Sequence, residues 1–437
     1  MVTNGKFECT SMLFCKKSFE NVFVTVTFGI TKKHLMKFGI IKERKNPPDR
    51  RVVFTPEELV RLQSEHPEAI IKVETSDIRV FTDDAYKKAG IEVADDISDC
   101  DVFFGVKEIP IDYLLPNKKY FFFSHTIKKQ IHNRKLLKAI LDKNIELYDH
   151  ETIVDASNRR LIGFGRYAGI VGAYNGFRGF GIKYDLFNLP KAETLQTKED
   201  LIARLKRQTL PNIKIVLTGH GKVGMGAKEI LDGMKIKEVS PDDFLNKIYT
   251  QAVYTQIDVL DYNKRIDATK VEDNIDFYKN PQDYTSNFER FTEVADVFMA
   301  GHFHGNGSPD ILTLEMLQVA DCKIKVVADI SCDVDGPIAS TIRSSTIAEP
   351  FYGYLPIENK EVLFTHPGSI MVMAVDNLPC ELPKDASEGF GEMFMEHVIP
   401  AFFNNDKDGI LARAKITENG KLTTRFAYLQ DYVEGRS

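Results

Sequence analysis

The feature that constrains this chain most is a glycine-rich turn, "VLTGHGKVGMGA", which lies between an apolar run and a helix-forming run. Gly219, Gly221 and Gly224 follow the G-x-G-x-x-G spacing, shortly after the mainly apolar residues 213–217. In that context Gly219 makes the tight turn, Gly221 lets backbone approach a pyrophosphate, and Gly224 lets helix and strand pack closely. The turn therefore predicts a dinucleotide-binding unit. The competing interpretation is a glycine-rich turn in a flavodoxin-like domain that holds no dinucleotide.

Apolar runs of strand length alternate with capped helical patterns along most of the 437 residues. Such alternation is typical of parallel sheets with helices packed on their faces. The first alternating series spans about 36–165, a Gly- and Ala-rich helical stretch follows it, and a second series begins near residue 213. We therefore predict an α/β fold of two Rossmann-like domains, with parallel sheets and an inter-domain cleft.

The two series also predict where the domains begin and end. Residues 36–165 and 381–437 are expected to form a substrate domain, and residues 166–380 a dinucleotide-binding Rossmann domain. Residues 1–35 are expected to be an N-terminal extension outside the core fold, because a clean strand pattern starts only after them. Near the C-terminus, "LTTRFAY" (422–428) has the pattern of a strand.

Composition narrows the class of partners. The net charge of −6 gives no electrostatic footprint for nucleic acid. The 6 cysteines show no C-x-x-C spacing, which is typical of reduced thiols in a cytoplasmic protein. No run of about 18 apolar residues occurs, so no membrane span is expected. We expect a cytoplasmic protein that acts on small molecules, and the sequence leaves its oligomeric state open.

Two apolar runs of the first series end at a titratable residue: "FGVKEIP" at Lys107 and "FFFSHTIKKQ" at His125. Because the carboxyl ends of parallel strands face the ligand crevice, both side chains are expected there. A lysine can act as a base only where burial or neighbouring cations lower its pKa. Arg51 and Arg160 adjoin apolar runs of the same domain and are candidate clamps for carboxylates. The cluster indicates an anionic substrate, although an ordinary surface position is the competing interpretation for each residue.

Several segments together resemble one family. "DRRVVFTP", "VKEIP", "FFSHTIK", "RRLIGFGRYAG", "ADISCD" and "AVDNLPCELPKDASE" are similar to lysine-forming saccharopine dehydrogenase and the lysine–2-oxoglutarate reductase domain. The wider group includes alanine dehydrogenase and transhydrogenase. The resemblance runs from about Met36 into the 390s. "SHTIK" followed by "FGRYAG" is specific to the saccharopine branch, whereas "VKE" and "RRVVFTP" would also fit alanine dehydrogenase.

The resemblance implies roles for particular residues. Lys107 and His125 would be the catalytic acid–base pair. The residues implied to line the substrate site are Arg51, Lys128, Arg160 and Phe164. The residues implied to line the dinucleotide site are Gly219, Gly221, Lys222, Val223, Gly224, Ser240, Phe303, Ile330, Ser331, Cys332, Val375, Asp376, Asn377 and Leu378.

The resemblance also implies a reaction. The chain would be an NAD(P)-dependent oxidoreductase that acts on the CH–NH group of its donor and reversibly cleaves saccharopine to L-lysine and 2-oxoglutarate, in lysine metabolism and amino-acid biosynthesis. No metal is expected. Three alternatives remain open: an alanine dehydrogenase-like enzyme with a smaller pocket, the same reaction run in reverse as a lysine–2-oxoglutarate reductase, and a nucleotide-binding protein that has lost catalysis.

Cofactor choice depends on the residue that ends the second strand of the dinucleotide domain. We expect that strand to be "IKEVS", which ends at Ser240. A carboxylate there would select NAD, and a serine neither binds the ribose well nor excludes a phosphate. Asp242 and Asp243 follow at once, and no arginine occurs in 227–264. The sequence thus predicts a modest preference for NAD, with NADP possible.

Overall fold

The computed structural model describes residues 35–271 and 273–436. The prediction for the N-terminal extension therefore lies outside the described residues, apart from Leu35. None of the described helices is long and apolar enough to cross a membrane.

The first sheet has six parallel strands in the order β3-β2-β1-β4-β5-β6. The strands are β1 (Met36–Ile40), β2 (Ala69–Glu74), β3 (Glu92–Ala94), β4 (Val102–Phe104), β5 (Lys119–Phe122) and β6 (Glu146–Asp149). The helices between them are α1 (Pro56–Glu65), α2 (Asp83–Lys88) and α3 (Arg134–Asp142). Helix α1 begins as its sequence predicts, because Thr55 and Glu58 form a reciprocal capping box.

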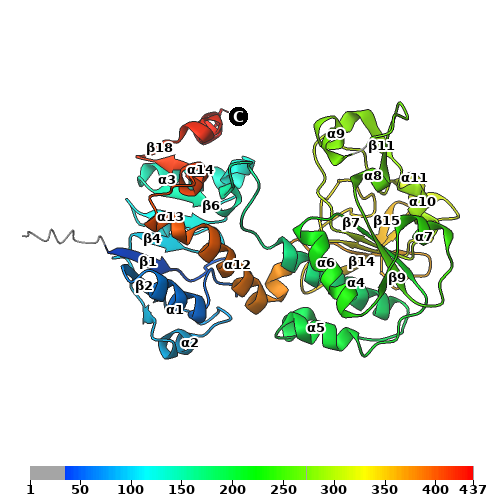
Figure 1. Ribbon diagram of the computed structural model, residues 1–437, viewed down its shortest axis with the longest axis horizontal. Helices are drawn as coiled ribbons and strands as arrows, with labels where there is room; N and C mark the ends of the chain where they lie inside the picture. The colour runs from blue at the N-terminus through cyan, green and yellow to red at the C-terminus, as the bar shows by residue number, and fades with distance from the viewer. Residues whose placement is uncertain (1–34, 272, 437) are drawn as a thin grey trace, which may run out of the picture. The chain divides into compact units, whose positions relative to one another are not determined.

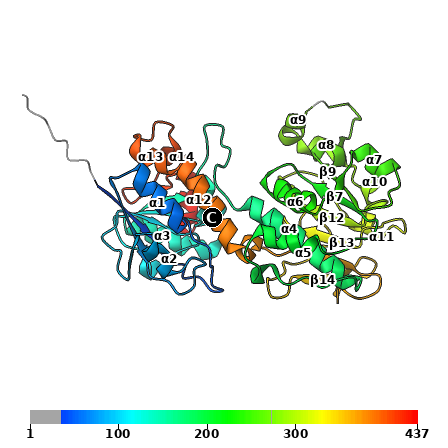
Figure 2. The same ribbon diagram turned by 60° about the horizontal axis from the view of Figure 1, so that its bottom comes forward.

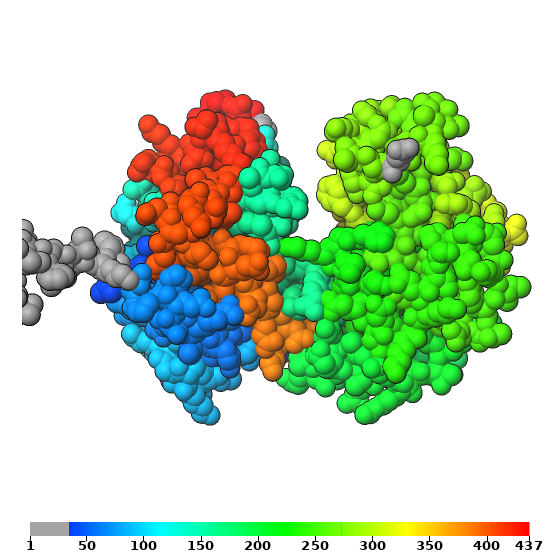
Figure 3. Space-filling view, in the orientation of Figure 1, coloured from blue at the N-terminus to red at the C-terminus, as the bar shows by residue number. Residues whose placement is uncertain are grey.

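The C-terminal segment packs against this same sheet. Its helices are α12 (Pro383–His397), α13 (Ile399–Phe403), α14 (Ile410–Ala414) and α15 (Gln430–Glu434). Phe402, in α13, contacts Phe38 of β1 edge to face at 5.3 Å between ring centroids. Figure 1 shows α12 to α14 beside the strands, and Figure 3 shows the last residues (orange and red) against the first described ones (blue). Residues far apart in sequence thus share one hydrophobic core.

The second sheet has eight strands in the order β15-β14-β16-β13-β12-β7-β9-β8. The strands are β7 (Lys214–Thr218), β8 (Lys237–Glu238), β9 (Val253–Ile257), β12 (Val297–Ala300), β13 (Val326–Asp329), β14 (Phe351–Leu355), β15 (Lys360–Val362) and β16 (Ile370–Met373). Six neighbouring strands of this sheet run parallel, in the order β16-β13-β12-β7-β9-β8. Strands β14 and β15 add an antiparallel edge beside β16. The predicted α/β fold of two Rossmann-like units is confirmed, whereas the cleft between them stays a prediction.

Helix α4 (Gly165–Lys183) packs on α6 (Lys222–Gly233), and Figures 1 and 2 both show the two helices side by side. Glycines permit the close approach. A Cβ on Gly169 would lie 2.0 Å from the Val223 carbonyl oxygen, and one on Gly226 would lie 1.9 Å from the Arg166 carbonyl oxygen. The close packing of α4 on α6 therefore requires glycine at both positions.

Two expectations about local structure are wrong. The strand beside β7 is β9, whereas the segment "IKEVS" forms only the two-residue edge strand β8, which pairs with β9. Its side chains are exposed, so little burial supports a longer strand. The predicted strand at 422–428 is instead mainly a 3-10 helix, Thr424–Leu429, after the short strand β18 (Lys421–Leu422). Phe426 and Leu429 are its buried residues, and their three-residue spacing fits a 3-10 turn.

Candidate active site

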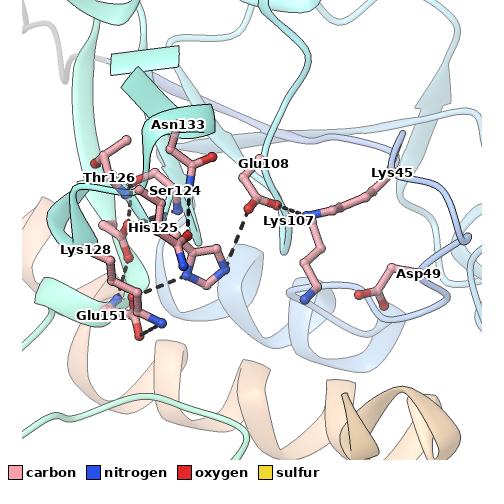
Figure 4. A network of polar contacts seen from close by, with 12 residues as sticks. Lys45, Asp49, Lys107, Glu108, Ser124, His125, Thr126, Lys128, Asn133 and Glu151 are labelled. Carbon is pink, nitrogen blue, oxygen red and sulfur yellow. Dashed lines mark hydrogen bonds and ion pairs between the residues drawn. The ribbon is translucent and has the colours of Figure 1, made fainter. Parts of the chain in front are cut away.

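Lys107 and His125 leave the first sheet at the same edge. The pairing of β4 and β5 continues past both strands, since the Phe123 amide donates to the Val106 carbonyl oxygen at 3.0 Å. Lys107 follows directly on one side of that bond, and His125 lies two residues beyond it on the other. Figure 4 shows the two side chains reaching the same region from adjacent loops. The structure therefore brings together the two residues that the sequence singled out.

Two buried carboxylates hold the backbone of these loops. Glu43, which follows β1, accepts the amides of Val106 (2.6 Å) and Lys107 (2.9 Å). Asp149, at the end of β6, accepts the amides of Ser124 (2.9 Å) and His125 (3.0 Å). Burial and the charge of Asp49 raise the pKa of Glu43 to about 7, and burial also raises the pKa of Asp149. Both loops are therefore fixed to neighbouring strands by side-chain carboxylates, in addition to the backbone hydrogen bonds of the sheet.

The His125 ring lies between two carboxylates. Its Nδ1 is 3.4 Å from Glu151 Oε2, and its Nε2 is 3.8 Å from Glu108 Oε1. The other oxygen of Glu108 accepts from Lys45 Nζ at 2.8 Å, and this bond orients the carboxylate. His125 itself adopts a left-handed backbone with φ 54°. The ring is thus oriented on both sides, which is what a group that relays protons requires.

Glu151 also lies close to two of the cationic residues predicted for the substrate site. Its Oε1 lies 3.5 Å from Lys128 Nζ and 3.6 Å from Arg160 Nη1. Burial would raise the pKa of Glu151, but its bond to the His125 ring and the charges of Arg160 and Lys128 outweigh burial and lower that pKa to about 2. The side chains of Lys128 and Arg160 remain 49% and 43% exposed. Two accessible cations therefore flank the histidine.

Arg51 has a different setting from the one expected. Its guanidinium donates to Asp49 through two parallel bonds of 3.0 and 2.6 Å, and both side chains are only 3% exposed. It also lies 4.2 Å above the Phe164 ring, which in turn stacks on Phe390. Figure 4 shows the Lys107 amine facing Asp49. Arg51 is therefore buried in a two-bond pair with its own carboxylate, whereas Lys128 and Arg160 share one carboxylate and remain partly exposed.

The carboxylates of this site were not predicted from the sequence. They are Glu43, Asp49, Glu108, Asp149 and Glu151. A usable signal was present, because Glu43, Glu108 and Glu151 each lie two to four residues after a strand of the first sheet. Acidic residues at that edge of a parallel sheet meet in space just as the basic ones do. Only the basic residues at this edge were predicted to belong to the site, because they could bind an anionic substrate.

The glycine turn fits a dinucleotide pyrophosphate. Gly219 has φ +90°, and a Cβ there would lie 2.7 Å from the Gly301 carbonyl oxygen. A Cβ on Gly224 would lie 2.0 Å from the Gly219 carbonyl oxygen, whereas one on Gly221 would meet nothing within 4 Å. Two glycines are thus required for packing, and Gly221 leaves open space at the N-terminus of α6, where a phosphate is favoured.

The other predicted dinucleotide residues lie mainly at the carboxyl edge of the second sheet. Phe303 follows β12, residues 330–332 follow β13, and residues 375–378 follow β16. Their exposure differs: Phe303 is 80% exposed, whereas Ile330, Val375 and Leu378 are at most 6% exposed. These three side chains therefore pack inside, and any contact of theirs with a cofactor would come from backbone. Within the turn, Lys222 Nζ donates to the Leu161 carbonyl oxygen at 3.1 Å.

The premise for Ser240 is wrong. Ser240 caps the short helix α7 (Pro241–Asn246), where its hydroxyl accepts from the Asp243 amide at 3.1 Å. It follows β8, which β9 separates from β7 and the glycine turn. The residue next to the turn is instead the one that ends β9.

His302 and His304 form an H-x-H motif in the sequence, and His302 contacts a threonine of the second sheet. His302 Nδ1 lies 2.7 Å from the Thr218 hydroxyl, and burial lowers the pKa of His302 to about 3. Among residues 35–271 and 273–436, no group of three or more His, Cys, Asp or Glu side chains is arranged to hold a metal ion. His302 thus links β7 to the loop after β12.

Comparison with known proteins gives a consistent group of relatives. The family description "Alanine dehydrogenase/PNT, N-terminal domain" matches residues 39–171. The chain is 29% identical to an alpha-aminoadipic semialdehyde synthase of Arabidopsis thaliana, over 90% of this chain and 41% of that protein. It is 26% identical to a saccharopine dehydrogenase [NAD(+), L-lysine-forming] of Candida glabrata, over 84% of this chain and 94% of that one. The chain thus spans less than half the length of the plant relative.

Solved structures share the fold. An L-alanine dehydrogenase matches with a TM-score of 0.60 at 15% identity, over 92% of this chain and 100% of that one. A transhydrogenase from Sinorhizobium meliloti matches with a TM-score of 0.54 at 16% identity, over 89% and 98%. At such identities the likeness concerns the fold.

Proposed function

We propose that the chain belongs to the family of lysine-forming saccharopine dehydrogenases and lysine–2-oxoglutarate reductases, within the alanine dehydrogenase/transhydrogenase group, and that it cleaves saccharopine oxidatively to L-lysine and 2-oxoglutarate. The Candida glabrata relative is named as an NAD(+)-dependent saccharopine dehydrogenase, and this name supports an enzyme of the dehydrogenase type that uses a nicotinamide cofactor. The substrate and the direction of the reaction are the proposal.

One observation carries the proposal: Lys128 and Arg160 meet at Glu151 beside the His125 ring. Saccharopine is a secondary amine with three carboxylates, so its binding calls for several cations near the reacting nitrogen. Lys128 and Arg160 are both accessible and separated from His125 by one carboxylate. Guanidinium and ammonium groups bind carboxylates directly. The site therefore suits a long, multiply charged substrate better than a small amino acid.

The chemistry assigns one task to each member of the pair. A bound nicotinamide supplies the hydride acceptor. Lys107, in its neutral form, takes the proton of the secondary amine as the adjacent carbon is oxidised and an imine forms. His125 then transfers protons while water adds to the imine and the carbinolamine splits into L-lysine and 2-oxoglutarate. Glu108 and Glu151 keep the ring oriented through both transfers.

A steady-state substrate panel tests the proposal. The panel compares saccharopine, L-lysine with 2-oxoglutarate, L-alanine, and pyruvate with ammonia. We expect turnover of saccharopine and of the reverse pair to exceed that of alanine and pyruvate by at least about 100-fold in kcat/KM, because the smaller substrates leave cations unpaired. Faster oxidation of alanine than of saccharopine would overturn the proposal in favour of an alanine dehydrogenase-like enzyme.

A matched pair of variants sharpens the test. Lys128→Met removes a cation from the Glu151 cluster, whereas Lys129→Met removes the next lysine, which lies 5.4 Å above the Tyr428 ring. We expect Lys128→Met to raise the KM for saccharopine about ten-fold or more, the worth of one charged hydrogen bond. Lys129→Met should leave that KM unchanged. Equal effects of the two substitutions would contradict the proposed substrate site.

A further inference from the structure

We propose that Tyr432 is a positioning residue for the substrate site, and that it acts by fixing the loop that carries Lys128. This inference deepens the proposed function and rests on it for the nature of the substrate. The loop spans residues 125–133, between β5 and α3, and Lys128 ends its first 3-10 turn, Thr126–Lys128. The position of the Lys128 amine therefore depends on what holds this loop.

The backbone of the loop needs support from outside. His125 and Lys129 have φ angles of 54° and 55°, in the left-handed region. Residues other than glycine adopt this conformation at a cost, and it persists where the surrounding structure holds it. Asp149 supports the beginning of the loop, because its carboxylate accepts the His125 amide at 3.0 Å. Lys128 lies three residues beyond that support.

Tyr432, in α15, supports the loop on the far side of Lys128. Its hydroxyl donates to the Gln130 carbonyl oxygen at 2.5 Å, across 302 residues of sequence. The Tyr432 side chain is fully buried, and the Arg134 guanidinium lies 5.4 Å above its ring. The ring also belongs to the hydrophobic cluster that includes Leu137 of α3. Because the packed ring cannot move freely, its hydroxyl fixes the backbone two residues after Lys128.

The C-terminal segment that contains Tyr432 also contacts the residues that lead to Arg160. Arg413 Nε, in α14, donates to the Val154 carbonyl oxygen at 3.2 Å. Val154 in turn pairs with Arg160 in an isolated antiparallel bridge. The backbone next to each of the two cations at Glu151 is thus held by the same segment.

The two supports of the loop have different consequences for the reaction. Asp149 fixes the backbone at His125, whose ring transfers protons in the proposed mechanism. Tyr432 fixes the part of the loop that follows Lys128, whose amine is proposed to bind a substrate carboxylate. Loss of the Tyr432 hydroxyl should therefore weaken substrate binding more than it slows the chemical step.

The experiment compares Tyr432→Phe, which removes the hydroxyl and keeps the ring, with Tyr428→Phe as the matched control. Tyr428 lies in the same C-terminal segment, and its side chain is 52% exposed. Steady-state kinetics with saccharopine and NAD give KM and kcat for the full chain and each variant. Amide hydrogen exchange of residues 125–133, measured without substrate, reports how firmly the loop is held. Thermal unfolding checks that both variants are folded.

We expect Tyr432→Phe to raise the KM for saccharopine about three- to ten-fold, the usual worth of one hydrogen bond, and to change kcat less than about two-fold. Exchange of the loop amides should become faster by a similar factor. Tyr428→Phe should behave as the wild type in all three measurements. In the double variant with Lys128→Met, KM should rise no further than in Lys128→Met alone, because Tyr432 acts through Lys128.

Four results would each overturn the role of Tyr432 and leave the proposed function intact: an unchanged KM, unchanged exchange of the loop, equal effects of the two tyrosine substitutions, or effects on KM that multiply in the double variant. If the wild type does not turn over saccharopine but exchange of the loop depends on Tyr432, the hold on the loop stands and the proposed substrate fails.

Discussion

Lys107 and His125 differ in how their side chains are held. The His125 ring contacts two carboxylates, whereas the backbone of Lys107 is fixed by Glu43 and its amine faces Asp49 without a direct bond. In the proposed mechanism, the His125 ring is therefore oriented before the substrate binds, whereas the Lys107 amine is free to move with the substrate. Both residues should nevertheless be required.

We expect Lys107→Met and His125→Gln each to lower the rate of saccharopine oxidation by about 10² to 10⁴-fold, the usual worth of a positioned acid or base. Binding of NADH, followed by fluorescence, should change little, because the glycine turn belongs to the second sheet. Near-normal turnover in either variant would remove that residue from the mechanism.

Asp149 holds the backbone around His125. Its Oδ2 accepts the Ser124 hydroxyl and the Ser124 and His125 amides, and its Oδ1 accepts the Glu151 amide, so an asparagine, with a single acceptor oxygen, could keep only one of these two sets of bonds. We expect Asp149→Asn to lower kcat about ten-fold or more while the KM for saccharopine changes less, because the ring loses its position and the cations do not. The exposed Asp142 provides the control, Asp142→Asn, which should have wild-type kinetics. A change in KM alone would contradict this positioning role.

At the scale of elements, helix α1 carries a titratable cap. Glu58 closes the capping box with Thr55, is 5% exposed, and packs against Gly391 of α12. Burial raises the pKa of Glu58 to about 8 from an ordinary value of 4.5. A carboxyl whose pKa is raised on folding stabilises the fold below its unfolded pKa, and this contribution is lost as the pH rises through the folded pKa.

We therefore expect stability to fall between about pH 5 and pH 9 in part through Glu58, and Glu58→Gln to flatten that fall by more than about 1 kcal/mol. The free energy of unfolding in denaturant, measured at several pH values, checks this. Glu57→Gln alters the neighbouring exposed position and should keep the wild-type pH dependence. An equally steep fall in Glu58→Gln would show that other groups cause it.

At the scale of the whole molecule, the first sheet depends on residues from the opposite end of the chain. The Thr417 hydroxyl accepts from the Leu147 amide at 3.0 Å and donates to the Ile145 carbonyl oxygen at 2.7 Å, across 270 and 272 residues. Thr417 is fully buried, so both backbone groups would lose a partner if the hydroxyl were removed.

We expect Thr417→Val to destabilise the protein by about 1–3 kcal/mol, the cost of leaving buried polar groups unpaired. Thr424→Val, at an exposed position of the same C-terminal segment, should cost much less. Thermal unfolding of the two variants measures this difference in stability. A Thr417→Val protein as stable as the wild type would mean that the C-terminal segment contributes little to the stability of this sheet.

The sequence by itself determined the periodic and local features of this protein. The alternation of strands and helices, the caps at Thr55 and Thr82, and the glycine turn are encoded in neighbouring residues, so they could be predicted. The placing of Lys107 and His125 at one edge also followed, because parallel strands end on the same side of a sheet.

Only the tertiary structure decided which strand lies beside the glycine turn and which carboxylates lie next to Lys107 and His125. β8 and β9 are adjacent in sequence, and their order in the sheet depends on how much apolar surface each buries: the two residues of β8 are exposed, whereas all five of β9 are buried. In the same way, Glu43, Glu108 and Glu151 come from the loops after β1, β4 and β6, and their contacts with the Lys107 amide, Lys45 and His125 arise only when the sheet forms. Long-range pairing, which no local pattern records, therefore places β9 rather than β8 beside the glycine turn.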